Sequence, residues 1–155
     1  MHEATKLFNK YHDSVPFVKD LMDAISRDGS AFGYIKTFGG RKCRFDMWEP
    51  VTFGMHKPQT FEEASLEHGS RNIKRAFTYK ALNKLIQGSA ADMTKKAMVD
   101  LYKEGIIPHI QVHDELDISV DNNADKIKEI MESAVQLEVP NKVDYESGPN
   151  WGTIK

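Results

Sequence analysis

The stretch "HIQVHDELDISV", residues 109–120, combines a β-strand pattern with charged residues at its centre. The apolar positions that favour a strand are Ile110, Val112, Leu116, Ile118 and Val120. Between them lies His113-Asp114-Glu115, where a single buried strand would place apolar side chains. The pattern therefore predicts two short strands joined by a tight turn that carries the acidic residues.

The acidic turn has two interpretations. Charged residues often occupy the turn of a hairpin, and His113 could be an ordinary packing residue there. Alternatively, the carboxylates serve phosphoryl transfer, in which two divalent cations roughly 3.5–4 Å apart are held by hard oxygen ligands. A tight turn presents such a carboxylate rigidly. Asp114 and Glu115 are adjacent, however, and are too few to hold two metal ions alone.

A long helix is predicted before this hairpin, over about residues 77–104. Its apolar residues at helical spacing are Leu82, Ile86, Met93, Ala97 and Leu101, and Gly105 is placed to end it. Asn83 and Gln87 are four residues apart, so their amides share one face. The small residues 88–91 ("GSAA") follow, although a glycine inside a helix costs roughly 1 kcal/mol relative to alanine. Small residues let either a polar, flat-edged ligand or a neighbouring strand approach the helix closely, and both interpretations stay open.

The first 45 residues predict two helices and a second hairpin. A short helix is expected over residues 3–12. Another helix is expected after Ser14 as a cap, with Pro16 in its first turn and Gly29 as its end. The stretch "GYIKTFGGRKCRF" (33–45) reads as a β-hairpin around a two-residue Gly-Gly turn.

The remaining segments alternate between irregular stretches and helices. A proline-containing stretch carries a capping box for one short helix, formed by Thr60 and Glu63. After the acidic turn, Asn122 or Asn123 is expected to cap a further helix. The apolar residues of that helix are Ile127, Ile130, Met131, Ala134 and Val135. Residues 141–151 ("NKVDYESGPNW") are expected to finish the chain as a strand and tail.

The composition is that of an ordinary soluble globular domain. The chain has 155 residues, of which 40% are hydrophobic and 28% charged, and this excludes a disordered or membrane-embedded protein. A single cysteine, Cys43, permits no internal disulfide and favours a reducing compartment. The first residues contain no apolar stretch typical of a signal peptide. We therefore expect an intracellular chain with no membrane partner.

The net charge of −2 conceals two segments of opposite sign. Residues 71–96 contain seven Lys or Arg against one acid, whereas residues 113–138 contain eight acids against two Lys. Such a division suits a protein that holds a polyanion and places a cation beside it. It equally describes two solvated helix faces, so charge alone does not decide between these interpretations.

Three motifs in their order along the chain resemble the C-terminal part of family A DNA polymerases, the polymerase I type, and most closely its phage branch. These motifs are "NKLIQGSAADMTKKAM" (83–98), "QVHDELDISV" (111–120) and "GPNW" (148–151). In addition, "GYIKTFGGRK" (33–42) is similar to the hairpin before the family's long helix, and "VPFVKDLMD" (15–23) resembles its last fingers-side helix. The resemblance covers nearly the whole chain and is weakest over residues 50–75.

The resemblance implies an α+β fold. An antiparallel palm-type β-hairpin sheet would pack against long helices, preceded by fingers-side helices. Residues 1–75 would form the fingers-side helices, the β-hairpin and an irregular linker. Residues 76–155 would form the palm core, with the primer-grip helix, the motif C hairpin, a helix and a C-terminal strand.

Site residues follow from the resemblance position by position. Asp114 matches the metal-binding catalytic aspartate of motif C, Glu115 its acidic neighbour near the metal, and His113 a catalytic-site contact with the primer terminus. Asn83 and Gln87 match contacts to the minor groove or template, whose acceptors are common to all correct base pairs. The remaining expected DNA-binding residues are Arg41 and Lys42, the family's basic pair, and Tyr79 and Lys80. Tyr79 stands where many family members have an arginine.

The family's other catalytic motifs are missing from this sequence. Motif A, with its second metal-binding aspartate, and motif B, with the nucleotide-binding lysine and aromatic residue, precede the segments found here. No stretch of the DxSxxE type or helix of the KxxxxxxxYG type occurs in the chain. The resemblance therefore implies half of a site for two Mg²⁺ or Mn²⁺ ions, which a carboxylate absent from this chain would complete.

The expected function is that of a C-terminal fragment or subunit of a DNA-directed DNA polymerase in DNA replication. Its expected partners are primer–template DNA, dNTP and an N-terminal polymerase half, either a separate chain or a missing segment. The isolated chain is expected to be inactive and to act in a bacterial cytoplasm or phage-infected cell. Because it begins with Met, it could be a separately encoded subunit of a split polymerase, but a truncated gene product or an expressed fragment is equally compatible. The alternative is a non-catalytic DNA-binding remnant of such a polymerase.

Overall fold

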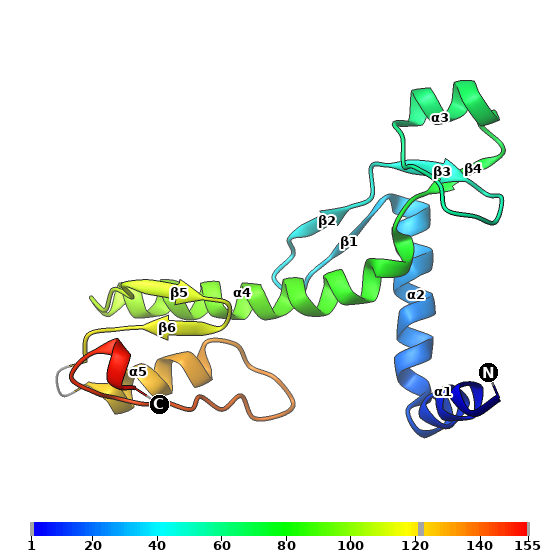
Figure 1. Ribbon diagram of the computed structural model, residues 1–155. Helices are drawn as coiled ribbons and strands as arrows, with labels where there is room; N and C mark the ends of the chain where they lie inside the picture. The colour runs from blue at the N-terminus through cyan, green and yellow to red at the C-terminus, as the bar shows by residue number, and fades with distance from the viewer. Residues whose placement is uncertain (1, 121–122, 155) are drawn as a thin grey trace. The chain divides into compact units, whose positions relative to one another are not determined.

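The computed structural model describes residues 2–120 and 123–154, except for the side chain of residue 2. The chain forms two compact units, Met1–Ser89 and Ala90–Lys155, and one helix runs through the boundary (Figure 1). The described residues contain helices and two-stranded antiparallel sheets, which confirms the predicted α+β fold. The division expected from the resemblance, into residues 1–75 and 76–155, concerns function and stays a prediction. No helix in the described ranges combines the length and hydropathy needed to cross a membrane.

The N-terminal helices α1 (His2–Ser14) and α2 (Pro16–Phe32) agree with prediction in number but not in their boundaries. Pro16 occupies the first turn of α2 as expected. Ser14 does not cap α2, because it lies in α1, where its hydroxyl donates to the Lys10 carbonyl at 2.8 Å. The residue before α2 is Val15, which offers no side-chain cap. The prediction of a Ser14 cap was therefore wrong.

The end of α2 also differs from prediction. Gly29 is buried inside the helix, and a Cβ atom added there would lie 3.0 Å from the ring of Phe45. The helix ends at Gly33, which has a left-handed φ of 76° and donates its N–H to the Gly29 carbonyl. Gly29 is thus a packing residue, and the expectation that it ends the helix was wrong.

The first hairpin pairs β1 (Tyr34–Lys36) with β2 (Lys42–Arg44), as predicted. Its turn is one residue longer than the expected Gly-Gly pair. The N–H of Thr37 donates to the Arg41 carbonyl at 2.9 Å, and the N–H of Gly40 donates to the Thr37 carbonyl at 2.9 Å. Gly40 has a φ of 82°, as the left-handed residue of a three-residue hairpin loop requires.

The core of the first unit lies where this hairpin meets α2 and the start of the long helix. Ile35, Phe45 and Ala81 are buried together. The partly buried residues around them are Ile25, Cys43, Phe77 and Leu85. The apolar side of the hairpin is thereby fixed, which determines which of its side chains face outward.

A second sheet in this unit was not predicted. β3 (Trp48–Pro50) pairs with β4 (Ile73–Arg75) across an intervening segment that contains α3 (Phe61–His68). The capping box at the start of α3 is confirmed, because Thr60 and Glu63 bond each other's backbone N–H groups. Strands of three residues, one of them ending in proline, carry too little alternation to be recognised in a sequence.

Arg75 ties the two sheets of this unit together. Its Nη1 donates to the Phe45 carbonyl at 2.9 Å, and its guanidinium lies 4.6 Å from the centroid of the Trp48 ring. The guanidinium also occupies the space beside Gly33, where an added Cβ atom would lie 2.6 Å from Cζ. A side chain at position 33 would have to displace this guanidinium and adopt a left-handed φ of 76°.

The long helix α4 (Ala81–Lys103) begins later than predicted. Phe77 has a left-handed φ of 63°, and a short 3₁₀ turn, η1 (Thr78–Lys80), separates it from α4. The predicted end is confirmed at Gly105, which has a φ of 76°. The N–H of Ile106 donates to the Leu101 carbonyl at 2.9 Å, so the helix closes with a Schellman motif.

The second unit contains the end of α4, strands β5 (Ile110–Val112) and β6 (Glu115–Asp117), α5 (Ala124–Ser133) and the 3₁₀ turn η2 (Trp151–Thr153). Its buried apolar residues are Ala97, Leu101 and Ile127. Lys126 bonds Glu104 at 2.7 Å and links α5 to the region after α4.

Two expectations for the second unit were wrong. Asn123 occupies the position before α5, but its side chain makes no capping bond and its Oδ1 has no partner among the described residues. Asn122, the other expected cap, lies outside the described residues. Residues 141–150 form no strand, although one was expected there. Proline and polar residues in this segment leave no alternating apolar face that could pair.

Apolar side chains of the first two helices are exposed. The exposed fractions are 63% for Phe8, 55% for Tyr11 and 67% for Phe17, while Met22 is half-buried. The sequence predicts this exposure, because the resemblance places missing structure upstream of these helices. Exposed apolar patches are typical of surfaces that contact a protein, a membrane or a ligand, and the covering segment expected here stays a prediction.

Candidate metal and nucleic-acid site

The β5–β6 hairpin places the acidic residues at its turn. The register pairs Val112 with Glu115, so His113 and Asp114 form a two-residue turn and Asp114 lies at the tip, as predicted. His113 adopts a left-handed φ of 53°, which is uncommon for residues other than glycine, although histidine, asparagine and aspartate adopt it more often than most. The amide Nε2 of Gln111 donates to the His113 carbonyl. The turn is therefore held by backbone pairing and by one side chain.

The carboxylates of Asp114 and Glu115 are exposed. Within residues 2–120 and 123–154, neither carboxylate makes an ion pair or a hydrogen bond. By contrast, Asp100 and Glu104 have lysine partners, and these lysines lower the pKa of both carboxyl groups. The turn thus presents hard oxygen donors that the described part of the chain does not neutralise.

These carboxylates are the hard oxygen donors that divalent cations prefer, but the two do not make a complete metal site. In the described ranges, no three His, Cys, Asp or Glu side chains are grouped closely enough to hold a metal ion. Mg²⁺ requires six oxygen ligands, several of which are usually water molecules or substrate phosphates. Asp114 and Glu115 can therefore supply part of a coordination shell that other groups complete.

The amides of the long helix lie on its solvent side. Ala81 is fully buried and Leu85 is partly buried against the first hairpin. Asn83 and Gln87 are each two residues further along, about 200° around the helix from these packing positions. Both amides are exposed. The pattern of burial therefore leaves one polar helix face available to a ligand.

The small residue at position 88 is explained by packing. A Cβ atom added to Gly88 would lie 2.8 Å from Cγ2 of Thr37 on the first hairpin. The Ser89 hydroxyl accepts a hydrogen bond from the Phe38 N–H at 3.2 Å. Ala90 and Ala91 are exposed. Packing on the hairpin therefore explains Gly88 and Ser89. The two alanines face solvent, so the ligand interpretation stays open for them.

The expected basic pair is split between two roles. Nη2 of Arg41 donates to the Gly88 carbonyl at 2.8 Å, which joins the hairpin to the long helix. Lys42 points away from the core, with its Nζ 4.2 Å from the centroid of the Tyr34 ring. A role for either residue in binding DNA stays a prediction.

Tyr79 and Lys80 both lie in the turn η1 and are exposed. Tyr79 has an exposed fraction of 69%. Nζ of Lys80 lies 4.8 Å from the centroid of the Phe77 ring and 5.6 Å from that of Tyr79. A cation and a phenol therefore stand together at the position where many family members carry an arginine.

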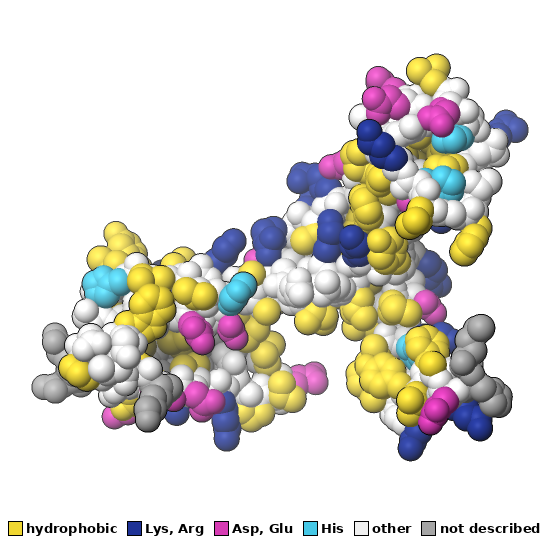
Figure 2. Space-filling model, viewed as in Figure 1, with side chains coloured by type: hydrophobic (Ala, Val, Ile, Leu, Met, Phe, Trp, Pro, Cys, Tyr) yellow, Lys and Arg dark blue, Asp and Glu magenta, His cyan; other side chains and the backbone are white. Residues whose placement is uncertain are grey.

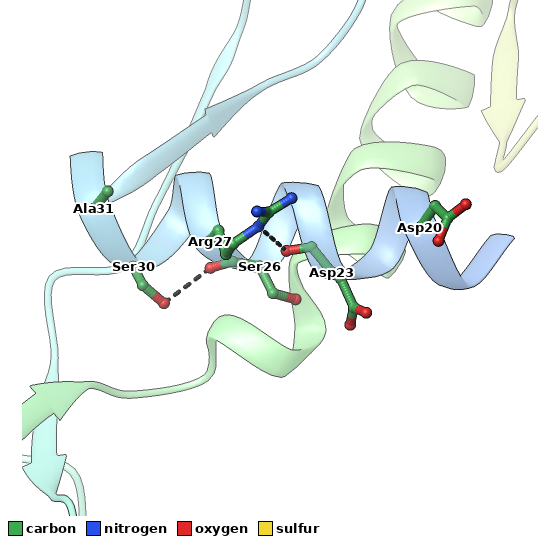
Figure 3. A pocket seen from close by; sticks show the side chains of 6 residues that line it. All are labelled: Asp20, Asp23, Ser26, Arg27, Ser30 and Ala31. Carbon is green, nitrogen blue, oxygen red and sulfur yellow. Dashed lines mark hydrogen bonds between the residues drawn. The ribbon is translucent and has the colours of Figure 1, made fainter. Parts of the chain in front are cut away.

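A hollow in the described surface lies elsewhere, along α2 (Figure 3). Its lining residues are Asp20, Asp23, Ser26, Arg27, Ser30 and Ala31. Arg27 and Ser30 bond to backbone carbonyls of the same helix, at 3.4 Å and 2.8 Å. The hollow is open, comes from one helix and contains none of the predicted site residues, so it is not the candidate site.

Two cations beside the predicted basic pair were overlooked in the sequence. Lys36 and Arg44 are exposed, and the register places them on the same face of the first hairpin as Lys42. Strict alternation in the stretch from Tyr34 to Arg44 could have identified this face, because residues two apart in a strand share a side.

Comparison with known proteins identifies the family. The family model for "DNA polymerase family A" matches residues 1–153. The chain is 38% identical over 152 residues to a DNA-directed DNA polymerase of Pseudomonas phage M6, covering 97% of this chain and 20% of that protein. It is 35% identical over 166 residues to DNA polymerase I of Geobacillus stearothermophilus, covering 99% of this chain and 17% of that protein. The chain thus spans about a fifth of the length of these relatives.

A solved structure supports the same assignment. The POL domain of Pol1 from M. smegmatis, solved in complex with DNA primer-template and dNTP, is similar with a TM-score of 0.70 and 27% identity. The match covers 99% of this chain and 26% of that chain. Together with the family match over nearly every residue, this similarity shows that the chain belongs to DNA polymerase family A.

Proposed function

We propose that this chain supplies the C-terminal part of a DNA-directed DNA polymerase. The observation that carries the proposal is the position of Asp114 at the tip of a two-residue turn, exposed and with no ion pair in the described ranges. Nothing in the packing of this hairpin calls for an acid at that position. A family A polymerase has a use for it, because template-directed nucleotidyl transfer needs carboxylates that hold divalent cations.

In this proposal, Asp114 binds Mg²⁺ or Mn²⁺, and Glu115 lies beside it on the first position of β6. When bound, the metal ions supply stabilisation of the charge that develops on the transferred phosphoryl group. His113 contacts the primer terminus from the same turn. The second metal-binding carboxylate and the nucleotide-binding helix come from an upstream polymerase half, either a separate chain or a preceding segment.

Asn83 and Gln87 hold the primer–template in the proposal. Both amides are exposed on one face of α4 and can donate to acceptors in the minor groove. Those acceptors are shared by correct base pairs of either orientation, which suits a polymerase that copies any sequence. The related POL domain was solved with DNA primer-template and dNTP, and this supports the same two ligands as partners here.

A non-catalytic DNA-binding remnant is the second candidate. The observation that favours it is the lack, in the described part of the chain, of any group of three metal-ligating side chains. Such a remnant would keep the amide face of α4 and lose the need for Asp114. The two candidates therefore differ in what the Asp114 carboxylate does.

The deciding experiment is a chimera in which this chain replaces the matching fifth of the phage M6 polymerase. We expect the chimera to extend a primer with Mg²⁺, whereas the isolated chain should incorporate no nucleotide. Asp114→Asn in the chimera should lower incorporation about 1,000-fold or more, since a lost metal ligand removes several kcal/mol of charge stabilisation. Duplex binding should be nearly unchanged, because the substitution keeps the size of the side chain.

The matched control is Asp125→Asn, which removes the same charge from the exposed first turn of α5. It should leave incorporation within a factor of two of the parent chimera. Gln87→Ala should have the opposite signature to Asp114→Asn, with weaker primer–template binding and unchanged dependence on Mg²⁺ concentration. Incorporation that stays within tenfold of normal after Asp114→Asn would establish the remnant instead.

A further inference from the structure

The β1–β2 hairpin has two faces of different chemistry. Ile35 lies on the inner face and is 4% exposed within the core. The register pairs Lys36 with Lys42 and Tyr34 with Arg44. Because side chains alternate along a strand, these four residues share the outer face. The outer face of the hairpin therefore consists of three cations and one tyrosine.

No acid neutralises this outer face among the residues that the structure describes. Lys36, Lys42 and Arg44 are exposed, and none of them forms an ion pair there. The nearest acid in the sequence, Asp46, lies beyond the end of β2. Figure 2 shows Lys and Arg side chains gathered over the hairpin. Three unneutralised cations on one small surface attract a polyanion.

The chemistry of the face favours phosphate groups over bases. The ammonium of Lys42 lies 4.2 Å from the centroid of the Tyr34 ring, so a cation occupies one face of the ring on which a base could stack. Arg44 offers a planar fork of donors that matches phosphate oxygens. Nothing on the face supplies an acceptor for base donors apart from the tyrosine hydroxyl.

The hairpin is held firmly enough to present these cations at fixed spacing. Arg41 bonds the Gly88 carbonyl at 2.8 Å, and Nζ of Lys84 bonds the Arg44 carbonyl at 3.4 Å. Side chains two residues apart on a strand are roughly 6.8 Å apart, and paired residues on neighbouring strands are about 5 Å apart. The three side chains thus start from neighbouring positions on one face of a hairpin that is bonded to α4.

We infer that Lys36, Lys42 and Arg44 form a phosphate-binding face that contacts the sugar–phosphate backbone of the duplex DNA. The inference rests on the proposed function, since it assigns these contacts to the same primer–template. It also gives Arg41 a different part from Lys42. Arg41 is a positioning residue that fastens the hairpin to α4, whereas Lys42 touches the nucleic acid.

Salt dependence of DNA binding tests the inference on the full 155-residue chain. Binding to a 20-base-pair primer–template duplex is measured by fluorescence anisotropy between 50 and 300 mM KCl. Each phosphate contact contributes about −0.9 to the slope of log K against log[salt]. The slope of the triple variant Lys36→Gln, Lys42→Gln, Arg44→Gln should therefore be less negative than that of the parent by about 2.7. At 0.1 M salt this corresponds to binding weaker by up to roughly 500-fold.

Two further variants separate specific contacts from net charge. The control triple variant Lys6→Gln, Lys10→Gln, Lys19→Gln removes the same charge from exposed positions on α1 and α2, and should change the slope by less than 1. The double variant Lys36→Arg, Lys42→Arg keeps both charges and should keep the parent slope. Thermal unfolding of each variant checks that the hairpin is intact.

Three results would overturn the inference. These are an unchanged slope in the hairpin variant, an equal loss in the control variant, and failure of the parent chain to bind the duplex at all. Binding to a 20-nucleotide single strand is measured in the same way. If it depends equally on the three cations, the assignment of this face to duplex DNA is overturned. The chimera results with Asp114→Asn and Gln87→Ala do not depend on this face, so failure here leaves the proposed function standing.

Discussion

The two hairpins of this chain have the same topology but differ in what explains their residues. In the β1–β2 hairpin, Ile35 is buried and the loop has glycine at its left-handed position. The Arg41 side chain and the Phe38 backbone N–H each donate a hydrogen bond to the long helix. In the β5–β6 hairpin, Ile110 and Val112 are 43% and 38% exposed, and the left-handed position is occupied by His113.

The contrast separates residues that packing explains from residues that packing does not explain. In the first hairpin, the left-handed position is occupied by glycine, and Arg41 has a hydrogen-bond partner on the long helix. The second hairpin carries a left-handed histidine and two unpaired acids that no described neighbour requires. Residues that break a local rule without a packing reason concentrate at functional sites.

The largest effect should come from breaking the contact between α4 and the first hairpin. Gly88→Val adds two methyl groups and a Cβ atom that would lie 2.8 Å from Thr37. The free energy of unfolding should fall by about 2–3 kcal/mol, as expected for overpacking at a tight site. Urea unfolding monitored by circular dichroism measures the change.

Ala90→Val is the matched control on the same helix. Ala90 is exposed, so only the lower helix propensity of a β-branched residue applies, and the loss should be about 0.5 kcal/mol. Equal losses in the two variants would mean that Gly88 is not a packing residue, and the ligand interpretation of the small residues would return for that position.

An intermediate effect should distinguish the two turns. Gly40→Ala introduces a side chain at a φ of 82° with no atom within 4 Å of the new Cβ, so it should destabilise through backbone strain alone, by about 1 kcal/mol. His113→Gly relieves a similar strain but adds flexibility to the unfolded chain. The net change in unfolding free energy should lie within about 0.5 kcal/mol of zero.

The same His113→Gly change should impair the chimera. Primer extension is expected to fall about tenfold, because the proposed contact of His113 with the primer terminus is lost. The Tm of the isolated chain should be nearly unaltered. A variant that loses stability and keeps extension would show that the histidine serves the fold of the turn.

The smallest effect concerns a carboxylate that the chain does pair, in contrast to those of the β5–β6 turn. Hydrogen bonds from Lys96 and Lys103 lower the pKa of Asp100. A lowered folded-state pKa stabilises the protein above the ordinary aspartate pKa, and the stabilisation is lost as pH falls through the lowered value. Asp100→Asn should therefore lower Tm slightly near neutral pH, and the difference should vanish in acid.

Lys96→Met should reproduce part of that small difference, because it removes the first of the two donors. Melting curves at several acidic and neutral pH values measure both variants. A difference in Tm that persists unchanged at the lowest pH would show that Asp100 acts through its shape and not through its charge.

Sequence patterns were sufficient where local chemistry decides the structure. The hairpins at residues 33–45 and 109–120 and the helix end at Gly105 follow from turn and capping residues that act over a few positions. The exposure of Phe8 and Phe17 was expected from the family resemblance, which places further structure beside their helices.

Sequence patterns failed where distant residues decide. Gly29 looks like a helix end but is buried against Phe45, sixteen positions later. The sheet of β3 and β4 depends on a pairing between Trp48 and Arg75 across a long intervening segment. For the site, the alternation of apolar residues was enough to predict that Asp114 lies in a turn. The hydrogen bond from Arg41 to the Gly88 carbonyl joins residues 47 positions apart and could be seen only in the structure.

The fit of Gly33 against Arg75 has a consequence for how this chain can change over generations. A side chain at position 33 would have to displace the guanidinium at a strained φ of 76°, and a shorter residue at position 75 would leave the Phe45 carbonyl without its donor. Neither substitution is tolerated well alone, so the two positions constrain each other although they lie 42 residues apart in the sequence. The pair also joins the residue before β1 to the last residue of β4, so a change at either position should disturb both sheets of the first unit.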